Sequence, residues 1–108
     1  MKEQNYLDHL VGVLGQPVAE NPGVVIQDAA FRALGLERWR YLTLDVDKDK
    51  LGDAIRGLKA LKMRGVNCTI PHKIAVMEYL DGISESARLI GVVNTIVIDN
   101  GRLYGDNT

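Results

Sequence analysis

The 108-residue sequence contains one cysteine, Cys68, so no disulfide can form within the chain. A single cysteine is usual in a reducing compartment, and we expect a cytoplasmic protein. No apolar run is long enough to span a bilayer, and the polar start from Met1 to Asn5 is unlike a secretory signal. The formal net charge is −1, so no basic surface is expected to attract nucleic acid or an anionic membrane.

Nucleotide-binding patterns are also absent. The sequence has 11 glycines, yet no two of them stand at positions i and i+2, which excludes a Gly-x-Gly-x-x-Gly cradle. No Gly-Lys-Ser/Thr and no Gly-x-Ser-x-Gly occurs, and no His, Cys and carboxylate residues stand at metal-ligand spacing. We therefore predict no metal site, and a nicotinamide cofactor would need a further domain.

The composition that remains is that of one globular domain. Hydrophobic residues make up 46% of the chain and charged residues 25%. A chain of this length buries a real core without disulfides or metal.

The hydrophobic pattern of the first half alternates between strands and helices. Leu10 to Leu14 is a short apolar run, ended by Gly15-Gln16-Pro17, and predicts a buried strand. A helix is expected after Asn21-Pro22-Gly23, with Ile26, Ala30 and Leu34 on one face and Gly35 as its stop. Residues 39–46 have strand character. Asp47 or Asp49 is then expected to cap a helix whose face against the sheet is formed by Leu51, Ile55, Leu58 and Leu61.

The second half ends in a hairpin. We expect a strand over 66–70, a helix over 72–80, and a short helix capped by Ser84 that runs to Leu89. Strands over 92–98 and 102–104 are joined by Asp99-Asn100-Gly101, and Asn-Gly favours a tight turn.

This order predicts an α/β fold, a three-layer sandwich with a mostly parallel central sheet and one late antiparallel hairpin. Leu58, Val66 and Ile90 are expected to be buried. Ligands of open α/β sheets bind beyond the carboxyl ends of the strands. Loops at such ends are expected at 15–23, at 69–73 and after Tyr104, with Lys73 at this edge.

Polar residues cluster where the third strand ends, in Asn67-Cys68-Thr69-Ile70-Pro71-His72-Lys73. Asn67 and Thr69 share a strand face, and Lys73 opens the next helix. An amide, a hydroxyl and an ammonium suit a polyol ligand, and a lysine can protonate a developing alkoxide. On the residue types alone, a solvated lysine at a helix start, with Asn67 and Thr69 bonding the backbone, is the more common arrangement.

The other polar residues are less informative. Asn94 follows an apolar segment and must find hydrogen-bond partners, from a ligand or from a neighbouring loop. Asp106 is expected to be solvated near the end of the chain. His72, beside Pro71 at a helix start, is expected to be a surface residue without a role, and Cys68 a small buried hydrophobe.

Taken together, these motifs resemble the shikimate dehydrogenase family. The resemblance runs from about Gly12 to Thr108, with the motifs in family order and spacing. The matching segments are residues 12–19, 29–36, 67–73, 89–95 and 105–108. Residues 1–11 then form an N-terminal extension and the start of the first strand. Residues 12–108 resemble the family's substrate-binding domain, truncated before the NADP-binding Rossmann domain.

The resemblance implies an activity for the full-length parent, in the chorismate pathway of aromatic amino acid biosynthesis. The family reduces 3-dehydroshikimate to shikimate with NADPH: a hydride goes to the ketone carbon while a lysine supplies the proton. Lys73 occupies that lysine's position, and Asn67, Thr69 and Asn94 occupy positions that bind ring hydroxyls. Thr108 ends the last motif, and the aspartate that follows it in the family lies beyond this chain.

One loop departs from the family pattern. The family has Ser-x-Ser where this sequence has Asn21-Pro22-Gly23, and those hydroxyls bind the substrate carboxylate. Asn21 can still donate one hydrogen bond, whereas Gly23 has no side chain. The alternatives are a relative that acts on quinate or another cyclic hydroxy acid, and a stand-alone binding or regulatory module. The 108 residues alone are expected to bind no cofactor and to be inactive.

Overall fold

The computed structural model describes residues 4–108 and confirms the alternation of strands and helices. No helix in this part of the chain is long and apolar enough to cross a membrane. The elements in chain order are β1 (His9–Gly15), α1 (Gly23–Ala33), β2 (Trp39–Asp45), η1 (Lys48–Lys50), α2 (Leu51–Ala60), β3 (Gly65–Cys68), α3 (His72–Ala75), η2 (Val76–Tyr79), β4 (Gly82–Ile83), α4 (Glu85–Ile90), β5 (Thr95–Asp99) and β6 (Arg102–Asp106).

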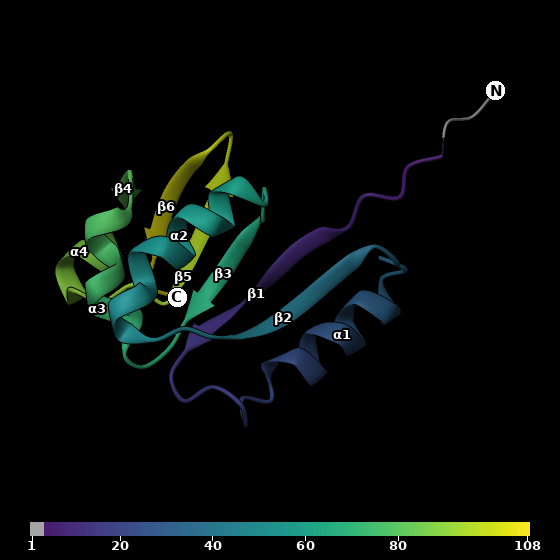
Figure 1. Cartoon of the computed structure of the whole chain (residues 1–108), viewed down its shortest axis with the longest axis horizontal. Helices are drawn as coiled ribbons and strands as arrows, with labels where there is room; N and C mark the ends of the chain where they lie inside the picture. The colour runs from purple at the N-terminus through teal and green to yellow at the C-terminus, as the bar shows by residue number, and fades with distance from the viewer. Residues whose placement is uncertain (1–3) are drawn as a thin grey trace.

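One six-stranded sheet connects all the strands, in the order β2-β1-β3-β5-β6-β4 (Figure 1). β1 pairs in parallel with both β2 and β3, and β4 pairs in parallel with β6. β5 is antiparallel to both of its neighbours, β3 and β6. The predicted α/β class, with its mostly parallel sheet and late hairpin, is therefore confirmed.

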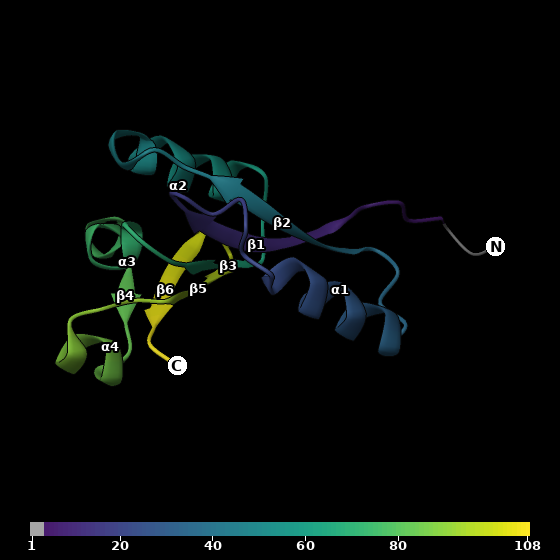
Figure 2. The same cartoon turned by 90° about the horizontal axis from the view of Figure 1, so that it is seen from below.

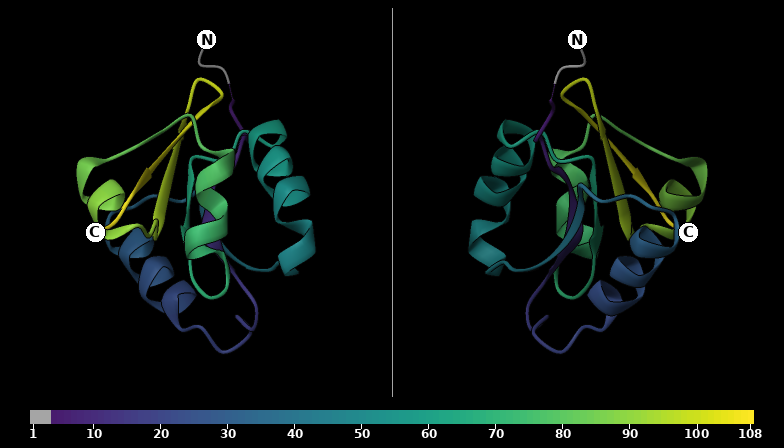
Figure 3. Two further views of the ribbon diagram at one scale, coloured as in Figure 1. Left: turned by 90° about the vertical axis from the view of Figure 1, so that its left-hand side faces the viewer. Right: turned by 90° about the vertical axis from the view of Figure 1, so that its right-hand side faces the viewer.

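Helices cover the two faces of the sheet unequally. α1 lies on one side of β1 and β2, and α2 lies on the other side (Figures 2 and 3). The larger core combines α2, η2 and α4 with one sheet face and includes Leu14, Leu58, Val66, Val76 and Ala87. A smaller cluster, centred on Val13, Val18 and Tyr41, packs against Val24 and Phe31 of α1.

In two helices, α1 and α4, the prediction of which side chains are buried is wrong. In α1, Ile26 is 66% exposed and Leu34 72%, because Val24 and Phe31 face the sheet instead. Phe31 also lies 5.9 Å from the ring of Trp39, so aromatic packing decides how the helix is rotated. Ile90 is 62% exposed, because the short helix α4 buries only Ala87.

The ends of the elements show which local signals were correct. Asn100 and Gly101 have φ of 50° and 76°, the left-handed pair that the expected hairpin turn requires. Ser84 caps α4, since its Oγ accepts a hydrogen bond from Ala87 N at 3.2 Å. The expected aspartate cap is wrong: neither η1 nor α2 has a side-chain cap, and Asp47 accepts from Gln16 Nε2 instead.

Leu58 and Leu61 form a matched pair, because the sequence predicted both on the packed face of α2. Leu58 is 4% exposed, whereas Leu61 is 66% exposed at the end of the helix. We expect Leu58→Ala to lower the free energy of unfolding by about 2–5 kcal/mol, through lost burial and a cavity. Leu61→Ala should change it by less than about 0.5 kcal/mol. Urea unfolding of both variants tests the assignment, and equal losses would contradict it.

Candidate functional site

Every sequence-predicted site residue lies at one edge of the sheet. β1, β2 and β3 run parallel, so their carboxyl ends lie side by side. These ends are Gly15 in β1, Asp45 in β2 and Cys68 in β3. β5 is antiparallel to β3, so β5 begins at this edge and the residues just before it lie there. β6 runs back and ends at the same edge, at Asp106. The C-terminus consequently lies near the end of β3 (Figure 1).

Backbone hydrogen bonds tie the loops of this edge together. Gln16 N donates to Ile70 O at 2.8 Å, and Val46 N donates to Gly15 O at 3.0 Å. The Gln16 side chain donates to Asp47 Oδ1 at 2.7 Å. The loops after β1, β2 and β3 therefore hold one another in place, and residues far apart in sequence keep a common geometry.

Gly15 allows the end of β1 to approach the loop after β3 closely. A Cβ on Gly15 would collide with Thr69 Cγ2 and would lie 3.3 Å from Ile70 O. Thr69 N also donates to Leu14 O at 3.0 Å. A side chain at position 15 would thus displace Thr69 from the edge where we expect a ligand.

A chain of hydrogen bonds connects three of the predicted ligands. Tyr41 Oη donates to Asn67 Oδ1 at 2.8 Å, and Asn67 Nδ2 donates to Thr95 Oγ1 at 3.4 Å. Thr95 Oγ1 in turn donates to Asn94 Oδ1 at 2.9 Å, which also accepts from Thr108 N at 3.1 Å. Asn67, Asn94 and Thr108 therefore belong to one polar network. The sequence pattern predicts Tyr41 only as part of the strand over residues 39–46.

Lys73 is linked to this network through its backbone. The carbonyl of Lys73 accepts a hydrogen bond from Val93 N at 2.9 Å, which holds the lysine beside the residue that precedes Asn94. Burial raises the pKa of the Cys68 thiol to about 12, and the positive charge of Lys73 opposes this rise. With its raised pKa, Cys68 remains a protonated, buried thiol and is not a nucleophile.

His72 contradicts the expectation of an exposed residue. Its side chain is 0% exposed, and Nε2 lies 2.7 Å from Val46 O. Because a carbonyl only accepts hydrogen bonds, Nε2 carries the proton. Nδ1 is buried and has no hydrogen-bond partner within residues 4–108. The imidazole thus ties α3 to the end of β2, and its inward position follows from tertiary packing that the local sequence does not reveal.

Asp106 remains partly exposed, as expected near the end of the chain, but it also accepts hydrogen bonds from neighbouring residues. Its Oδ1 accepts hydrogen bonds from Ser84 Oγ at 2.6 Å, Ser86 Oγ at 3.2 Å and Asn107 N at 2.8 Å. The bond from Ser84 is the main cause that lowers the pKa of the Asp106 carboxyl. Asp106 therefore positions the last motif, since Asn94 N also donates to its backbone carbonyl at 3.0 Å.

The loop after β1 borders a hollow of about 360 Å³. Its lining consists of Thr69 and the loop residues Pro17, Val18, Ala19, Glu20 and Asn21. Asn21 Oδ1 accepts a hydrogen bond from Gly23 N at 2.9 Å. Asn21 and Thr69, predicted from different segments, thus share one surface.

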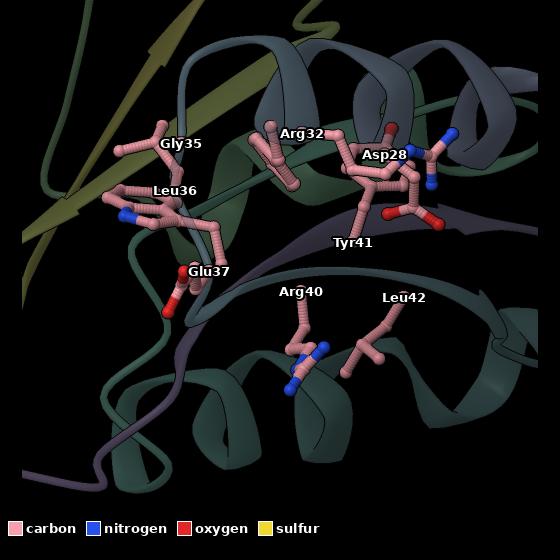
Figure 4. A pocket seen from close by; sticks show the side chains of 10 residues that line it. Asp28, Arg32, Gly35, Leu36, Glu37, Arg40, Tyr41 and Leu42 are labelled. Carbon is pink, nitrogen blue, oxygen red and sulfur yellow. The ribbon is translucent and has the colours of Figure 1, made fainter.

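A larger hollow of about 500 Å³ lies elsewhere, between α1 and the edge strand β2. Figure 4 shows Tyr41 on the α1 side of β2, with Asp28 and Arg32 on the helix, whereas Arg40 and Leu42 point to the other side. Apart from Tyr41, its lining includes none of the residues of the polar network. The chemistry expected from the sequence is therefore not located there.

The turn from β1 into α1 does not fit a dinucleotide phosphate. The space in front of Gly15 is filled by Thr69, and residues 16–22 separate Gly15 from the first residue of α1. Within residues 4–108, no three His, Cys, Asp or Glu side chains gather as a metal site either. This turn therefore lacks the glycine-rich geometry that cradles a dinucleotide phosphate.

Ser84→Ala tests the role assigned to Asp106. Loss of the hydroxyl should raise the pKa of Asp106 toward its ordinary value and cost about 1 kcal/mol of stability through the lost cap. A depressed carboxyl pKa stabilises the fold above the unfolded pKa, and this contribution is lost as pH falls through the native pKa. The variant should therefore lose less stability on acidification. NMR titration measures the pKa; Ser86→Ala is the control with a smaller rise, and an unchanged pKa in Ser84→Ala would contradict the assignment.

Comparison with known proteins identifies this architecture. Residues 13–96 match the family model described as the shikimate dehydrogenase substrate binding domain. The chain is 45% identical over 100 residues to the shikimate dehydrogenase (NADP(+)) of Methanothermobacter thermautotrophicus, covering 93% of this chain and 35% of that protein. It thus spans about a third of the length of such relatives.

Solved structures that are similar to this chain support the same family. Ligand-free 5-ketofructose reductase of Gluconobacter sp. strain CHM43 superposes with a TM-score of 0.93 at 44% identity, over 96% of this chain and 37% of that one. Shikimate 5-dehydrogenase from Listeria monocytogenes, in complex with shikimate and NAD, superposes with a TM-score of 0.88 at 33% identity, over 96% and 37%. The chain belongs to the shikimate dehydrogenase family and corresponds to its N-terminal substrate-binding domain.

Proposed function

We propose that this chain is the substrate-binding part of an NADP-dependent dehydrogenase that interconverts a ketone and an alcohol on a polyhydroxylated molecule. Lys73 is the proton donor to the carbonyl oxygen, and Asn67, Thr69, Asn94, Asn21 and Thr108 bind the substrate. The observation that supports this most is the meeting of Lys73, Asn67, Asn94 and Thr108 at one edge of the sheet.

The lysine suits the charge that ketone reduction creates. Negative charge develops on the carbonyl oxygen as the ketone is reduced, and a nearby ammonium both stabilises it and supplies the proton. Lys73 is half-buried, at the start of a helix that follows β3. NADPH is the hydride donor of the family, and we expect a further domain to bind it, since Thr69 fills the space in front of Gly15.

The asparagines suit hydroxyl groups. An amide donates and accepts hydrogen bonds, as a hydroxyl does. Asn67 Oδ1 is held by Tyr41, which leaves a donor hydrogen on its Nδ2 beyond the one given to Thr95. A preorganised amide of this kind binds a substrate hydroxyl with little loss of side-chain entropy.

The names of the relatives support two candidate ketone substrates. The relatives called shikimate dehydrogenase support 3-dehydroshikimate, and with it a place in the chorismate pathway. The reductase from Gluconobacter supports 5-ketofructose. A relative that acts on quinate and a stand-alone binding module are the other readings. Downstream coding sequence separates them: Asp-Gly followed by a strand and a glycine-rich turn favours an enzyme, whereas a stop codon favours the module.

Lys73→Ala tests the proton donor in the full-length parent. We expect kcat to fall by roughly a hundred- to ten-thousand-fold with little rise in KM, because the lysine acts mainly in the transition state. Lys59→Ala, which removes an exposed lysine at the end of α2, is the matched control and should retain full activity. Steady-state kinetics with NADPH and either ketone measures both parameters. Retention of most of the turnover by Lys73→Ala would remove Lys73 from this role.

The 108-residue chain alone should bind no NADPH, because it lacks a glycine-rich cradle and Thr69 fills the space before Gly15. Isothermal titration calorimetry of the chain with NADPH measures this directly. The full-length parent provides the positive control. Specific binding by the isolated chain at micromolar concentration would contradict the assignment of the cofactor to another domain.

A further inference from the structure

The two edges of the sheet differ in length. β4 forms one edge with two residues, whereas β2 forms the other with seven (Figure 1). Proteins protect exposed edges with short strands, prolines, bulges or charges, because unpaired peptide groups readily pair with another strand. β2 contains no proline, pairs with β1 residue by residue without a bulge, and has no charged side chain between Tyr41 and Leu44. The centre of β2 is therefore an unprotected edge.

The peptide groups of Tyr41 and Thr43 point to this free edge. His9 N donates to Arg38 O at 2.8 Å, and Val46 N donates to Gly15 O at 3.0 Å, so the even-numbered residues of this segment bond to β1. Successive residues of a strand direct their peptide groups to opposite sides. Within residues 4–108, no strand pairs with the outer side of β2. An added strand would satisfy the free N–H and C=O groups.

A hollow of about 500 Å³ lies along the same edge and is lined by Arg32 of α1 (Figure 4). The side chain of Tyr41 faces this hollow, and Asp45 shares its strand face because side chains alternate. Neither Arg32 nor Asp45 forms an ion pair within the described part of the chain. Arg32 follows Phe31, whose ring lies 5.9 Å from Trp39 at the start of β2, whereas Asp45 ends the strand. The two charges therefore stand at opposite ends of β2.

We propose that β2 forms the interface of a homodimer, in which β2 of a second copy pairs with it in antiparallel orientation about a two-fold axis at Leu42. Tyr41 of each copy then lies opposite Thr43 of the other, and each such pair exchanges two backbone hydrogen bonds. The two copies extend one sheet across both chains. This interface does not depend on the proposed function.

The side chains agree with this register. Trp39 lies opposite Asp45 of the second copy, so this aspartate enters the hollow beside Arg32 and gains the cation that it lacks in one chain. On the other face of the sheet, Leu42 meets Leu42 of the second copy as an apolar cross-strand pair. A parallel arrangement would instead place Asp45 beside Asp45, and like charges directly opposite are destabilising. Charge thus favours the antiparallel copy.

Cysteine cross-linking of the 108-residue chain tests the register. In Leu42→Cys the new thiols face each other at the axis, where the Cα atoms of a non-hydrogen-bonded pair lie about 4.5 Å apart, as a disulfide requires. In Leu44→Cys, the matched control on the same strand face, the two positions lie roughly 13 Å apart along the strand. Oxidised glutathione should convert most of the first variant and little of the second into a covalent dimer on a non-reducing denaturing gel. The native Cys68 is 3% exposed and does not compete.

Sedimentation equilibrium measures the dimer without a cross-link. At about 100 μM, the unaltered chain should show twice its mass of 11.9 kDa. Thr43→Pro removes an outward N–H and leaves the bonds to β1 in place, so it should weaken dimerisation by about tenfold or more. Far-UV circular dichroism shows whether this variant keeps its fold.

Charge reversal provides a second test that leaves the backbone unchanged. Arg32→Glu and Asp45→Lys should each weaken dimerisation roughly tenfold, because every dimer contains the contact twice. The two changes combined should restore most of the affinity. Arg88→Glu, the same change on the exposed side of α4, is the control and should have no effect.

The outcomes decide between this interface and other uses of the edge. A monomeric chain at the stated concentration would leave β2 to another protein or to a further domain of the parent, and would overturn the proposal. A dimer that neither Thr43→Pro nor the charge reversals weaken would also overturn it. Equal cross-linking of Leu42→Cys and Leu44→Cys would contradict the antiparallel register.

Discussion

The mutual attachment of the loops after β1, β2 and β3 is the constraint on which the rest of the site depends. Gly15 and Gln16 exchange backbone hydrogen bonds with Val46 and Ile70, and His72 adds a third contact to Val46. None of these bonds involves a predicted substrate ligand. They nevertheless determine where Thr69 and Lys73 stand, because both residues lie on the segment that these bonds hold.

The antiparallel insertion of β5 brings in the other half of the site. A purely parallel sheet would start β5 at the opposite edge and leave Asn94 far from Asn67. Here Asn67 pairs with Thr95, and Thr95 pairs with Asp106, so the last motif returns to the edge where β3 ends. The tight turn at Asn100 and Gly101 makes this return possible within a few residues.

Charge divides the edge into two parts with different chemistry. Lys73 provides the cation beside the end of β3, whereas Glu20 provides an anion in the loop after β1. In the proposed reaction the ammonium of Lys73 meets the oxygen that becomes negative.

By itself, the sequence determined the alternation of strands and helices, the hairpin turn, the Ser84 cap and the family motifs, because each depends on neighbours within about one turn or one strand. It failed for the exposed faces of α1 and α4 and for His72, and it gave no sign of the hydrogen bonds of Asp106. Only the tertiary structure decided these. Phe31 packs on Trp39 of the next element, whereas His72 bonds Val46 and Asp106 bonds Ser84 across long separations in the chain. Burial and polar pairing between distant segments have no local pattern from which they could be read.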